Sequence, residues 1–566
     1  MIILINQVKR LINSPHDERS VQGWSSQKSF NFNLLTLEPF RVSLNNGGMK
    51  ILFGLMSAVG LGWVSGPAWA VPAPDYRLGV VLVVDQFRSD YLLRFRRDFK
   101  SPSESGYRML MERGAYFPLA DHGLLQNMTG PGHAVILSGS YPYRNQISTN
   151  VWFDREKKKP QYCVSDDSFP LVGPGGEVSG ARNGVSPRLM NADTVGDELK
   201  NADRPSRVVS VALKDRAAVL MGGKRADHAV WFDDRNCQWV TSTFYGKTLP
   251  GFALEQNQKN ASQKSKLLSW GPFRDFSWCS KEGLQTPFAM EKTFELALAA
   301  VDELKLGQGR DTDLLLVSLS SHDYYGHHHG PNDPHMKQMV LDEDRLVSEF
   351  LKKLAKKVPG GLKDSWIVLT GDHGIPPSAL PQDRIPSENI PPERLPRLVE
   401  EEMEKKFGKP RSGKWVESVV EFQVYFNPDA LREASLKPQD ALRAVRERLL
   451  REPYIDQVWA RDEILYERKI PAGEYGKVAD RTLSRNSGDW IVVLKPFYYS
   501  DSYRITHMTH YSYDRYVPLL FYGKGFRPGT YRQIVNMVDI APTLSSLMGV
   551  LPPAQSEGRV LTEVLR

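Results

Sequence analysis

Short apolar runs recur along the chain and alternate with longer segments in which apolar residues are spaced three and four positions apart. The short runs are typical of buried β-strands, and the longer segments, at residues 294–304 and 339–354, are typical of helices with one buried face. This alternation predicts an α/β protein with a mostly parallel central sheet flanked by helices. The clearest strands are expected at residues 79–85, 207–214, 313–320, 365–372 and 517–523.

Two segments interrupt this rhythm. Residues 233–292 are rich in Asn, Gln, Ser, Lys and aromatic residues, and residues 376–486 begin with the Pro-rich stretch PPSALPQDRIPSENIPPERLP. We expect both to be insertions that form a cap or accessory lobe on a catalytic domain spanning residues 75–566. The Pro-rich stretch favours a rigid connector.

The N-terminal region has the features of a targeting segment. Met49 and Lys50 precede the apolar run ILFGLMSAVGLGWVSG, and Ala68-Trp69-Ala70 is a small-x-small cleavage site. This predicts a secretory signal peptide at residues 49–70, cleaved near Ala70. Residues 1–48 are then an over-extended N-terminus. The alternative, an N-terminal anchor helix, is less favoured because the run is shorter than the ~20 residues of a membrane span.

Composition narrows the classes of function. The 566 residues carry 73 Lys and Arg against 66 Asp and Glu, so the net charge of +7 is small for the length. With 41% hydrophobic and 25% charged residues, the chain is globular, and this balance does not favour nucleic acid as a main partner or a protein with several membrane spans. The three cysteines allow one disulfide and one thiol, with the pairing open.

Candidate metal ligands follow three of the expected strands. Asp85 ends the first strand, Asp323 follows DLLLVSLSSH, and Asp372-His373 follows SWIVLTG. His327 lies four residues after Asp323, which brings both side chains to one side of a helical turn. Carboxylate and imidazole ligands without cysteine suit two hydrolytic zinc ions better than a structural zinc.

A sixth ligand is expected from THMTHYSYDRYVPLLFYG, which offers His507 and His510. The other histidines near Asp323 and His327 are expected to be exposed to solvent or to hydrogen-bond to a metal ligand without binding the metal. These are His322, His328, His329 and His335.

The segment NMTGPGHAVILSGS places Thr129 before Gly130-Pro131-Gly132 and an apolar, helix-like run. A hydroxyl at a helix N-terminus lies where free N–H groups favour an anion. A helix-capping threonine is the common alternative. The interpretation of Thr129 as a nucleophile depends on a metal that lowers its pKa.

Three further residues could hold a tetrahedral oxyanion. Asn150 lies in ISTNVWFD, and Lys214 and Arg216 lie in VALKDRAAV at the end of another strand. Because alternate strand residues point the same way, Lys214 and Arg216 are expected to face one site. A planar Arg donor set and a Lys point charge suit a phosphoryl group with two negative charges. A solvated strand end is the alternative for this pair.

Taken in order, these motifs resemble the alkaline phosphatase superfamily, and specifically the bacterial alkaline phosphatases with a threonine nucleophile, the phosphate-irrepressible type. The resemblance runs from about Asp85 to the C-terminus and implies an alkaline-phosphatase-like fold. It implies one zinc ion held by Asp323, His327 and His507, and another held by Asp85, Asp372 and His373 with Thr129 as nucleophilic ligand. It also implies that Asn150, Lys214 and Arg216 bind the phosphoryl oxygens.

The choice of His507 over His510 rests on the family's closing pattern. In that pattern the ligand lies four residues before a Tyr and seven before the Asp of a Tyr-Asp pair, which are Tyr511 and Asp514 here. Met508 departs from the pattern, in which glycine is expected.

The resemblance predicts a bacterial phosphomonoesterase, periplasmic or secreted, that acts on small-molecule phosphate monoesters through a covalent phospho-threonine. It also implies two zinc ions per chain and no membrane contact after signal cleavage. Sulfatases need a Cys or Ser that becomes formylglycine, which Thr129 does not supply. Nucleotide pyrophosphatase/phosphodiesterases share the Thr and Asn but generally lack a Lys-x-Arg pair, so a diester hydrolase on the same scaffold is the first alternative. An inactive metal- or polyanion-binding protein is the alternative from another class.

Overall fold

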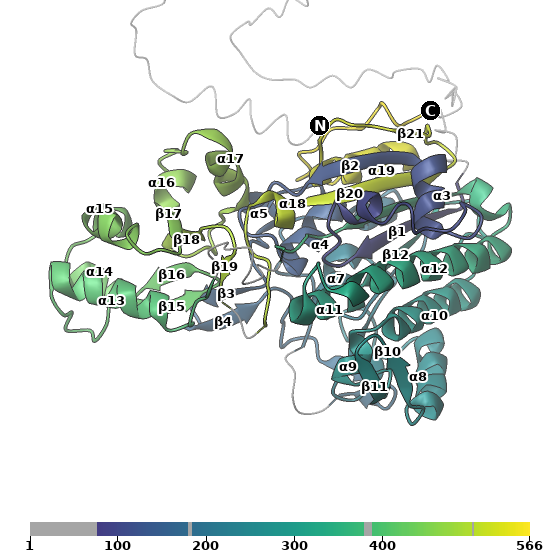
Figure 1. The fold of residues 1–566 in the computed structure, drawn as a ribbon, viewed down its shortest axis with the longest axis horizontal. Helices are drawn as coiled ribbons and strands as arrows, with labels where there is room; N and C mark the ends of the chain where they lie inside the picture. The colour runs from purple at the N-terminus through teal and green to yellow at the C-terminus, as the bar shows by residue number, and fades with distance from the viewer. Residues whose placement is uncertain (1–75, 179–183, 378–387, 501–502) are drawn as a thin grey trace, which may run out of the picture. The chain divides into compact units, whose positions relative to one another are not determined.

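A large twisted sheet runs through the computed structural model, which describes residues 76–178, 184–377, 388–500 and 503–566 (Figure 1). Its strand order is β21-β2-β20-β13-β1-β12-β7-β8-β9-β5-β6, in which the short outer strands are β21 (Gly529–Thr530), β5 (Leu171–Gly173) and β6 (Gly176–Glu177). The strands β13 (Ser365–Gly371), β1 (Leu78–Val84), β12 (Asp313–Leu319) and β7 (Val208–Ala212) are parallel neighbours. The predicted α/β fold with a mostly parallel sheet is therefore confirmed.

All five predicted strands are present, and their ends differ slightly from the prediction. The strand expected at 207–214 ends at Ala212, two residues early, because the chain turns there into helix α7 (Asp215–Gly222). The last strand, β20 (Tyr516–Gly523), pairs antiparallel with β13 and with β2 (Ala115–Asp121). The sheet is thus mixed on one side of β13.

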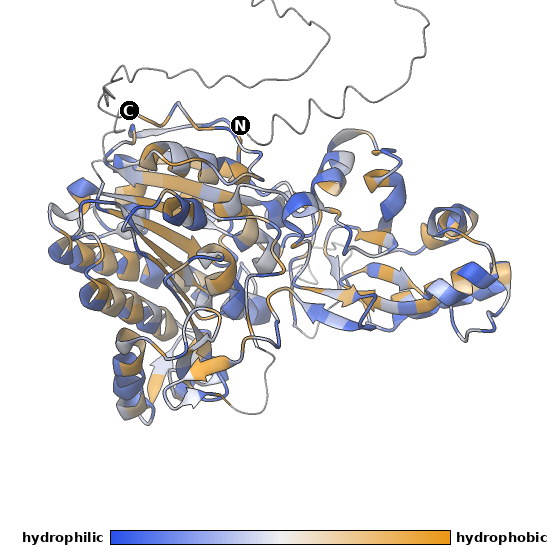
Figure 2. Cartoon of the chain, turned by 180° about the vertical axis from the view of Figure 1, so that it is seen from behind, coloured by the Kyte–Doolittle hydropathy of each residue, from blue (hydrophilic) through white to orange (hydrophobic). Residues whose placement is uncertain are grey.

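Helices cover both faces of the sheet, so the central strands are buried and largely apolar. Val80, Leu82 and Val84 of β1 pack in one core with the helices α10 (Pro287–Leu304) and α12 (Pro334–Lys357). Val81 and Val83 face the other core, which includes α4 (Thr129–Ser138) and α19 (Ile540–Met548). Figure 2 shows the result, with largely orange central strands between helices that carry blue outer faces.

Residues 388–500 carry a second, smaller sheet of order β15-β16-β18-β17 with a hydrophobic core of its own. Its antiparallel strands are β15 (Val416–Val420), β16 (Gln423–Phe426), β18 (Trp490–Leu494) and β17 (Ile455–Ala460). The helices α13 (Arg394–Phe407) and α15 (Pro438–Leu449) pack on it. Strand β18 belongs to this sheet although it lies after residue 486, where the insertion was expected to end. Residues 378–387 of the Pro-rich stretch lie outside the described residues.

The earlier segment, residues 233–292, extends the central sheet by one strand and also forms a separate two-stranded hairpin. Strand β9 (Gln238–Ser242) pairs antiparallel with β8 (His228–Asp233). Helix α8 (Gly251–Gln263) packs against α10, and β10 (Leu268–Trp270) and β11 (Phe273–Phe276) form a hairpin.

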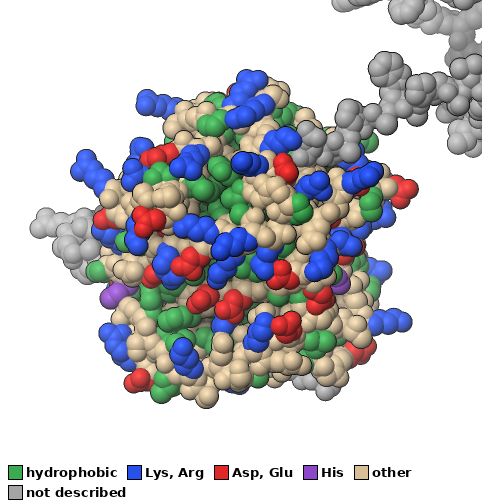
Figure 3. All heavy atoms as spheres, turned by 90° about the vertical axis from the view of Figure 1, so that its right-hand side faces the viewer, with side chains coloured by type: hydrophobic (Ala, Val, Ile, Leu, Met, Phe, Trp, Pro, Cys, Tyr) green, Lys and Arg blue, Asp and Glu red, His purple; other side chains and the backbone are tan. Residues whose placement is uncertain are grey.

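Charged side chains of both signs are distributed over the surface shown in Figure 3. On the face that Figure 3 presents, Lys and Arg side chains are interspersed with Asp and Glu, and no block of one sign dominates it. In the described part of the chain, we find no helix with the length and apolar character of a membrane span. The predicted signal peptide and the residues before it lie outside the described residues.

A disulfide joins Cys237 and Cys279, whose Cα atoms are 5.7 Å apart, and Cys163 is a buried free thiol. This pairing realises the expected balance of one disulfide and one thiol. The bridge ties the turn between β8 and β9 to the segment just before helix α9 (Lys281–Leu284).

Replacing Cys237 and Cys279 together with alanine is expected to lower the free energy of unfolding by about 2–4 kcal/mol, since the bridge closes a loop with a sequence separation of 42 residues. Urea unfolding of the two proteins measures this difference. The wild type in excess reductant should match the variant, and an unchanged urea midpoint in the variant would contradict a stabilising role.

Candidate active site

The site lies beyond the carboxyl ends of β13, β1 and β12, where the side chains that follow parallel strands converge. The register pairs Val84 of β1 with Gly371 of β13 and with Leu319 of β12, so Asp85 and Asp372 leave the sheet at the same level. Asp323 lies in the first turn of α11 (Ser321–His329), directly after β12. The three carboxylates are all buried.

One cluster of possible metal ligands contains Asp323, His327 and His507, with one ligand atom of each within 4.8 Å of the others. The Nε2 atoms of His327 and His507 lie 3.2 and 3.7 Å from Asp323 Oδ1. The Nδ1 atom of His327 is 2.9 Å from the carbonyl of Ile505, and that of His507 is 2.7 Å from the carbonyl of Asn127. These carbonyls hold both rings so that Nε2 faces the carboxylate, as metal-binding histidines require.

The second cluster brings His373 together with Asp85 and Asp372. His373 Nε2 lies 3.4 Å from Asp85 Oδ1 and 3.5 Å from Asp372 Oδ2, and its Nδ1 is 2.9 Å from the Gly374 carbonyl. Asp85, Asp323 and His373 also each have a ligand atom within 4.8 Å of those of the other two, so Asp323 borders both clusters. The six predicted ligands therefore lie in one buried centre.

Unbalanced negative charge makes this centre fit divalent cations. Among the described residues, Asp85 Oδ1 accepts no hydrogen bond, and Asp85 Oδ2 is paired with a single cation, the Lys214 ammonium, at 2.7 Å. Burial and the neighbouring carboxylates of Asp323 and Asp372 raise the pKa of Asp85 well above its usual range. Buried carboxylates of this kind need metal ions or cations as partners. Carboxylate and imidazole donors without thiolates suit zinc.

Lys214 supplies a positive charge within this centre. Its Nζ atom lies 2.7 Å from Asp85 Oδ2 and 2.5 Å from Asp323 Oδ2. Burial alone would lower the pKa of Lys214, but the carboxylates of Asp323 and Asp85 outweigh burial and raise it. The lysine is therefore cationic and lies between the two clusters.

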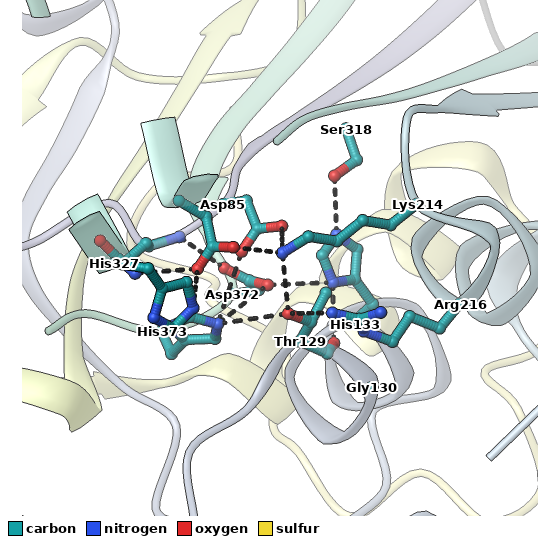
Figure 4. Close-up of polar contacts among 12 residues, drawn as sticks. Asp85, Thr129, Gly130, His133, Lys214, Arg216, Ser318, His327, Asp372 and His373 are labelled. Atoms are coloured by element: carbon teal, nitrogen blue, oxygen red, sulfur yellow. Dashed lines mark hydrogen bonds and ion pairs between the residues drawn. The ribbon is translucent and has the colours of Figure 1, made fainter. Parts of the chain in front are cut away.

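Thr129 is the first residue of α4, as its sequence position predicts, and its hydroxyl points into the centre (Figure 4). Thr129 Oγ1 lies 3.5 Å from His373 Nε2, 3.3 Å from Lys214 Nζ and 3.4 Å from Arg216 Nη2. The next backbone N–H, that of Gly130, donates a 2.7 Å hydrogen bond to Asn150 Oδ1. One hydroxyl thus contacts both predicted clamp residues and a candidate metal ligand.

The predicted reason for the convergence of Lys214 and Arg216 was wrong. They do not alternate along a strand, because β7 ends at Ala212 and Lys214 immediately precedes α7. Arg216 lies in the first turn of that helix. Both side chains reach Thr129 because the turn between strand and helix directs them toward it.

His133 and Gln86 were not predicted as site residues. The Nδ1 atom of His133 lies 2.8 Å from the Thr129 carbonyl and 3.2 Å from Asp372 Oδ2, and its Nε2 is 2.9 Å from Ser318 Oγ. The spacing of four residues from Thr129 within one helix is the signal that points to His133. Gln86 contacts two of the carboxylates, and no pattern in the sequence marks it.

Three other histidines of the described residues, His510, His322 and His335, lie outside the two clusters. His510 packs against the rings of Tyr475 and Tyr511. His322 Nδ1 lies 3.0 Å from Glu343 Oε2, and His335 Nδ1 lies 3.2 Å from Asp333 Oδ1.

Met508 follows His507 with a backbone φ of 114°, in a region that favours glycine. This agrees with the glycine expected from the family pattern, and His507 reaches the cluster despite the change to Met508.

A cavity of about 480 Å³ opens beside Lys214 and Arg216. Its walls include Tyr162, Trp231 and Tyr324, so it has both aromatic and charged lining. Tyr162 is part of the same polar network, because Arg216 Nη1 donates a 3.2 Å hydrogen bond to its hydroxyl oxygen. A group attached to a phosphoryl held at Thr129 would have room on this side.

A mostly parallel α/β sheet that brings Asp and His side chains and a helix N-terminal threonine together beyond its carboxyl edge is the arrangement expected of a hydrolase of the alkaline phosphatase type. The family model of type I phosphodiesterase / nucleotide pyrophosphatase matches residues 79–513. The chain therefore belongs to this family of the alkaline phosphatase superfamily, and the predicted resemblance is confirmed.

Individual relatives agree with this assignment. Alkaline phosphatase PafA of Elizabethkingia meningoseptica is 32% identical over 534 residues, which cover 88% of this chain and 95% of that protein. Alkaline phosphatase PhoV of Synechococcus elongatus is 30% identical over 537 residues, covering 87% and 93%. The crystal structure of wild-type PafA superposes with a TM-score of 0.78 at 31% identity and covers 88% of this chain and 100% of that one. The chain is thus an enzyme of the alkaline phosphatase group.

Proposed function

We propose that the protein is a two-zinc phosphomonoesterase that hydrolyses small-molecule phosphate monoesters through a phospho-threonine at Thr129. The observation that carries the proposal is the convergence of Lys214 and Arg216 on Thr129 Oγ1, at 3.3 and 3.4 Å. Two cationic donors around one nucleophile match the two negative charges of a monoester. The names of the relatives PafA and PhoV, both alkaline phosphatases, support the same activity.

Each of the two clusters is proposed to bind one zinc ion. Asp323, His327 and His507 would hold one zinc ion, and Asp85, Asp372 and His373 would hold the other. When bound, two ions at such a centre lower the pKa of an attacking hydroxyl and stabilise charge on the attacking and leaving oxygens.

The chain's own groups bind and orient the phosphoryl group. Lys214, Arg216 and Asn150 are proposed to hold its non-bridging oxygens. In the first step the Thr129 hydroxyl gives its proton to solvent, the bond from Oγ to phosphorus forms, and the bond from phosphorus to the leaving oxygen breaks. The leaving oxygen takes up a proton from solvent and departs as the alcohol. Water then cleaves the phospho-threonine, which releases phosphate and restores the hydroxyl.

A diester hydrolase is the second candidate, because the matching family model includes phosphodiesterases. The charge of the clamp favours a monoester, since a diester carries one negative charge at phosphorus and leaves one cationic group without a partner.

Wild type is expected to have a higher kcat/KM for an aryl phosphate monoester than for the matched aryl diester. Lys214→Ala or Arg216→Ala should each lower the monoester value by ~10²–10³, because each removes a donor to the transition state. The diester value should fall less. Lys224→Ala, which removes a surface lysine paired with Asp193, serves as the control. A wild-type preference for the diester would overturn the monoesterase proposal.

We also propose that the catalytic domain spans residues 75–566, with cap insertions at about residues 233–292 and 376–486. The protein is proposed to work in the periplasm or outside the cell after cleavage near Ala70. The disulfide between Cys237 and Cys279 supports an oxidising compartment. N-terminal sequencing of the mature protein tests the cleavage site, with Val71 as the expected first residue.

A further inference from the structure

Gln86 occupies an unfavourable backbone position directly behind the proposed metal centre. It follows Asp85 at the end of β1, its side chain is fully buried, and its φ is 67°. Residues other than glycine rarely adopt this left-handed conformation. Strained positions of this kind persist where the surrounding structure fixes them, which is common at functional sites.

The contacts of Gln86 connect the two clusters. Its backbone N–H donates a 3.0 Å hydrogen bond to Asp372 Oδ1, and its side-chain Nε2 donates a 2.8 Å hydrogen bond to Asp323 Oδ1. An ionised carboxylate only accepts hydrogen bonds, so the amide must present its nitrogen to Asp323. One residue therefore holds a carboxylate from each cluster.

The bond to Asp323 bears on the oxygen that faces the histidines. Asp323 Oδ1 is the atom nearest to Nε2 of His327 and of His507, whereas Oδ2 contacts Lys214. A donor fixed on Oδ1 keeps the carboxylate from turning further toward the lysine. Hydrogen bonds from residues behind a ligand are a general means of orienting it for a metal.

Gly326 provides the space that the Gln86 amide occupies. A Cβ atom at residue 326 would lie 1.7 Å from Gln86 Oε1, far inside contact distance. Gly326 lies inside α11, between Asp323 and His327, where glycine is otherwise unfavourable. The glycine and the glutamine thus fit each other, although they are 240 positions apart in the sequence.

We propose that Gln86 is a positioning residue that sets the Asp323 and Asp372 carboxylates for metal binding, and that Gly326 is the space this role requires. The inference rests on the proposed two-zinc function. It predicts that the amide raises zinc affinity even in the absence of substrate, so that it can be measured without turnover.

The test is a zinc titration of the metal-free full chain against a chromophoric chelator. Gln86→Met keeps the length of the side chain and removes its donor, and it is expected to lower zinc affinity by about 10–100-fold. Gln86→Gly removes the side chain but keeps the backbone N–H that binds Asp372. Gln423→Met, which removes another buried, hydrogen-bonded glutamine, is the control and should keep wild-type affinity.

Gly326→Ala tests the same inference without changing the glutamine. Its Cβ should displace the Gln86 amide and lower zinc affinity, whereas in the Gln86→Gly background the same change should add no further loss. Thermal unfolding of the metal-free variants identifies any that fail to fold. Unchanged affinity in the folded single variants, or losses that multiply in the double variant, would overturn the inference. A wild type that binds no zinc would instead reject the proposed function.

Discussion

Replacing Thr129 with alanine is expected to lower kcat/KM for an aryl phosphate monoester by about 10⁴-fold or more, because the variant cannot form the phospho-enzyme. The hydroxyl lies at the N-terminus of α4, within 3.5 Å of His373 Nε2, Lys214 Nζ and Arg216 Nη2. The donors around it would remain after the substitution. The loss therefore reports the nucleophile and not phosphate binding.

Three comparisons sharpen this experiment. Thr129→Ser restores a hydroxyl and should recover much of the activity. Thr241→Ala removes a buried threonine hydroxyl that bonds to the Ala229 carbonyl, so it controls for the loss of such a group. Acid quenching of wild type during turnover should trap phosphate on the peptide that contains Thr129. Full activity of a folded, zinc-loaded Thr129→Ala variant is incompatible with the proposed mechanism.

The central sheet was predictable from the sequence because its strands are buried on both faces. Runs such as GVVLVVD contain almost no polar residue, and few structures other than a covered parallel strand bury such a run. The end of β7 was predicted too late because Leu213 continues the apolar run after the chain has left the sheet. A pattern of hydrophobicity records burial, and a residue in a buried turn has the same pattern as one in a strand.

Some residues of the candidate site were predictable from the sequence, and others were not. Asp85, Asp323 and Asp372 were predictable because parallel strands carry the residues that follow them to one edge of the sheet. Lys214 and Arg216 do converge on one site, as predicted. The predicted geometry was wrong, because they lie at the start of helix α7 and not on a strand. Gln86 could not be predicted, because its role depends on Gly326 and on two carboxylates that are distant in sequence.

His507→Ala is expected to leave fewer than two zinc ions per chain and to lower monoester kcat/KM by about 10³-fold, since losing an ion removes several kcal/mol of transition-state stabilisation. The physical reason is the position of His507 Nε2, which lies 3.7 Å from Asp323 Oδ1 within the first cluster. The Asn127 carbonyl holds its Nδ1 at 2.7 Å, so the ring is already oriented for metal binding.

His510→Ala is the matched control, because His510 is a buried histidine of the same segment, three residues later, and lies outside both clusters. Burial, with a smaller effect from the nearby Arg515, lowers the pKa of His510 to about 4, so the ring is neutral at pH 7. It packs against Tyr475 and Tyr511. Its loss should therefore lower stability while leaving both ions and most of the activity. Zinc content by metal analysis and kcat/KM, measured on both variants, separate a ligand from a packing residue. The reverse result, with zinc lost only from His510→Ala, would move the sixth ligand to His510.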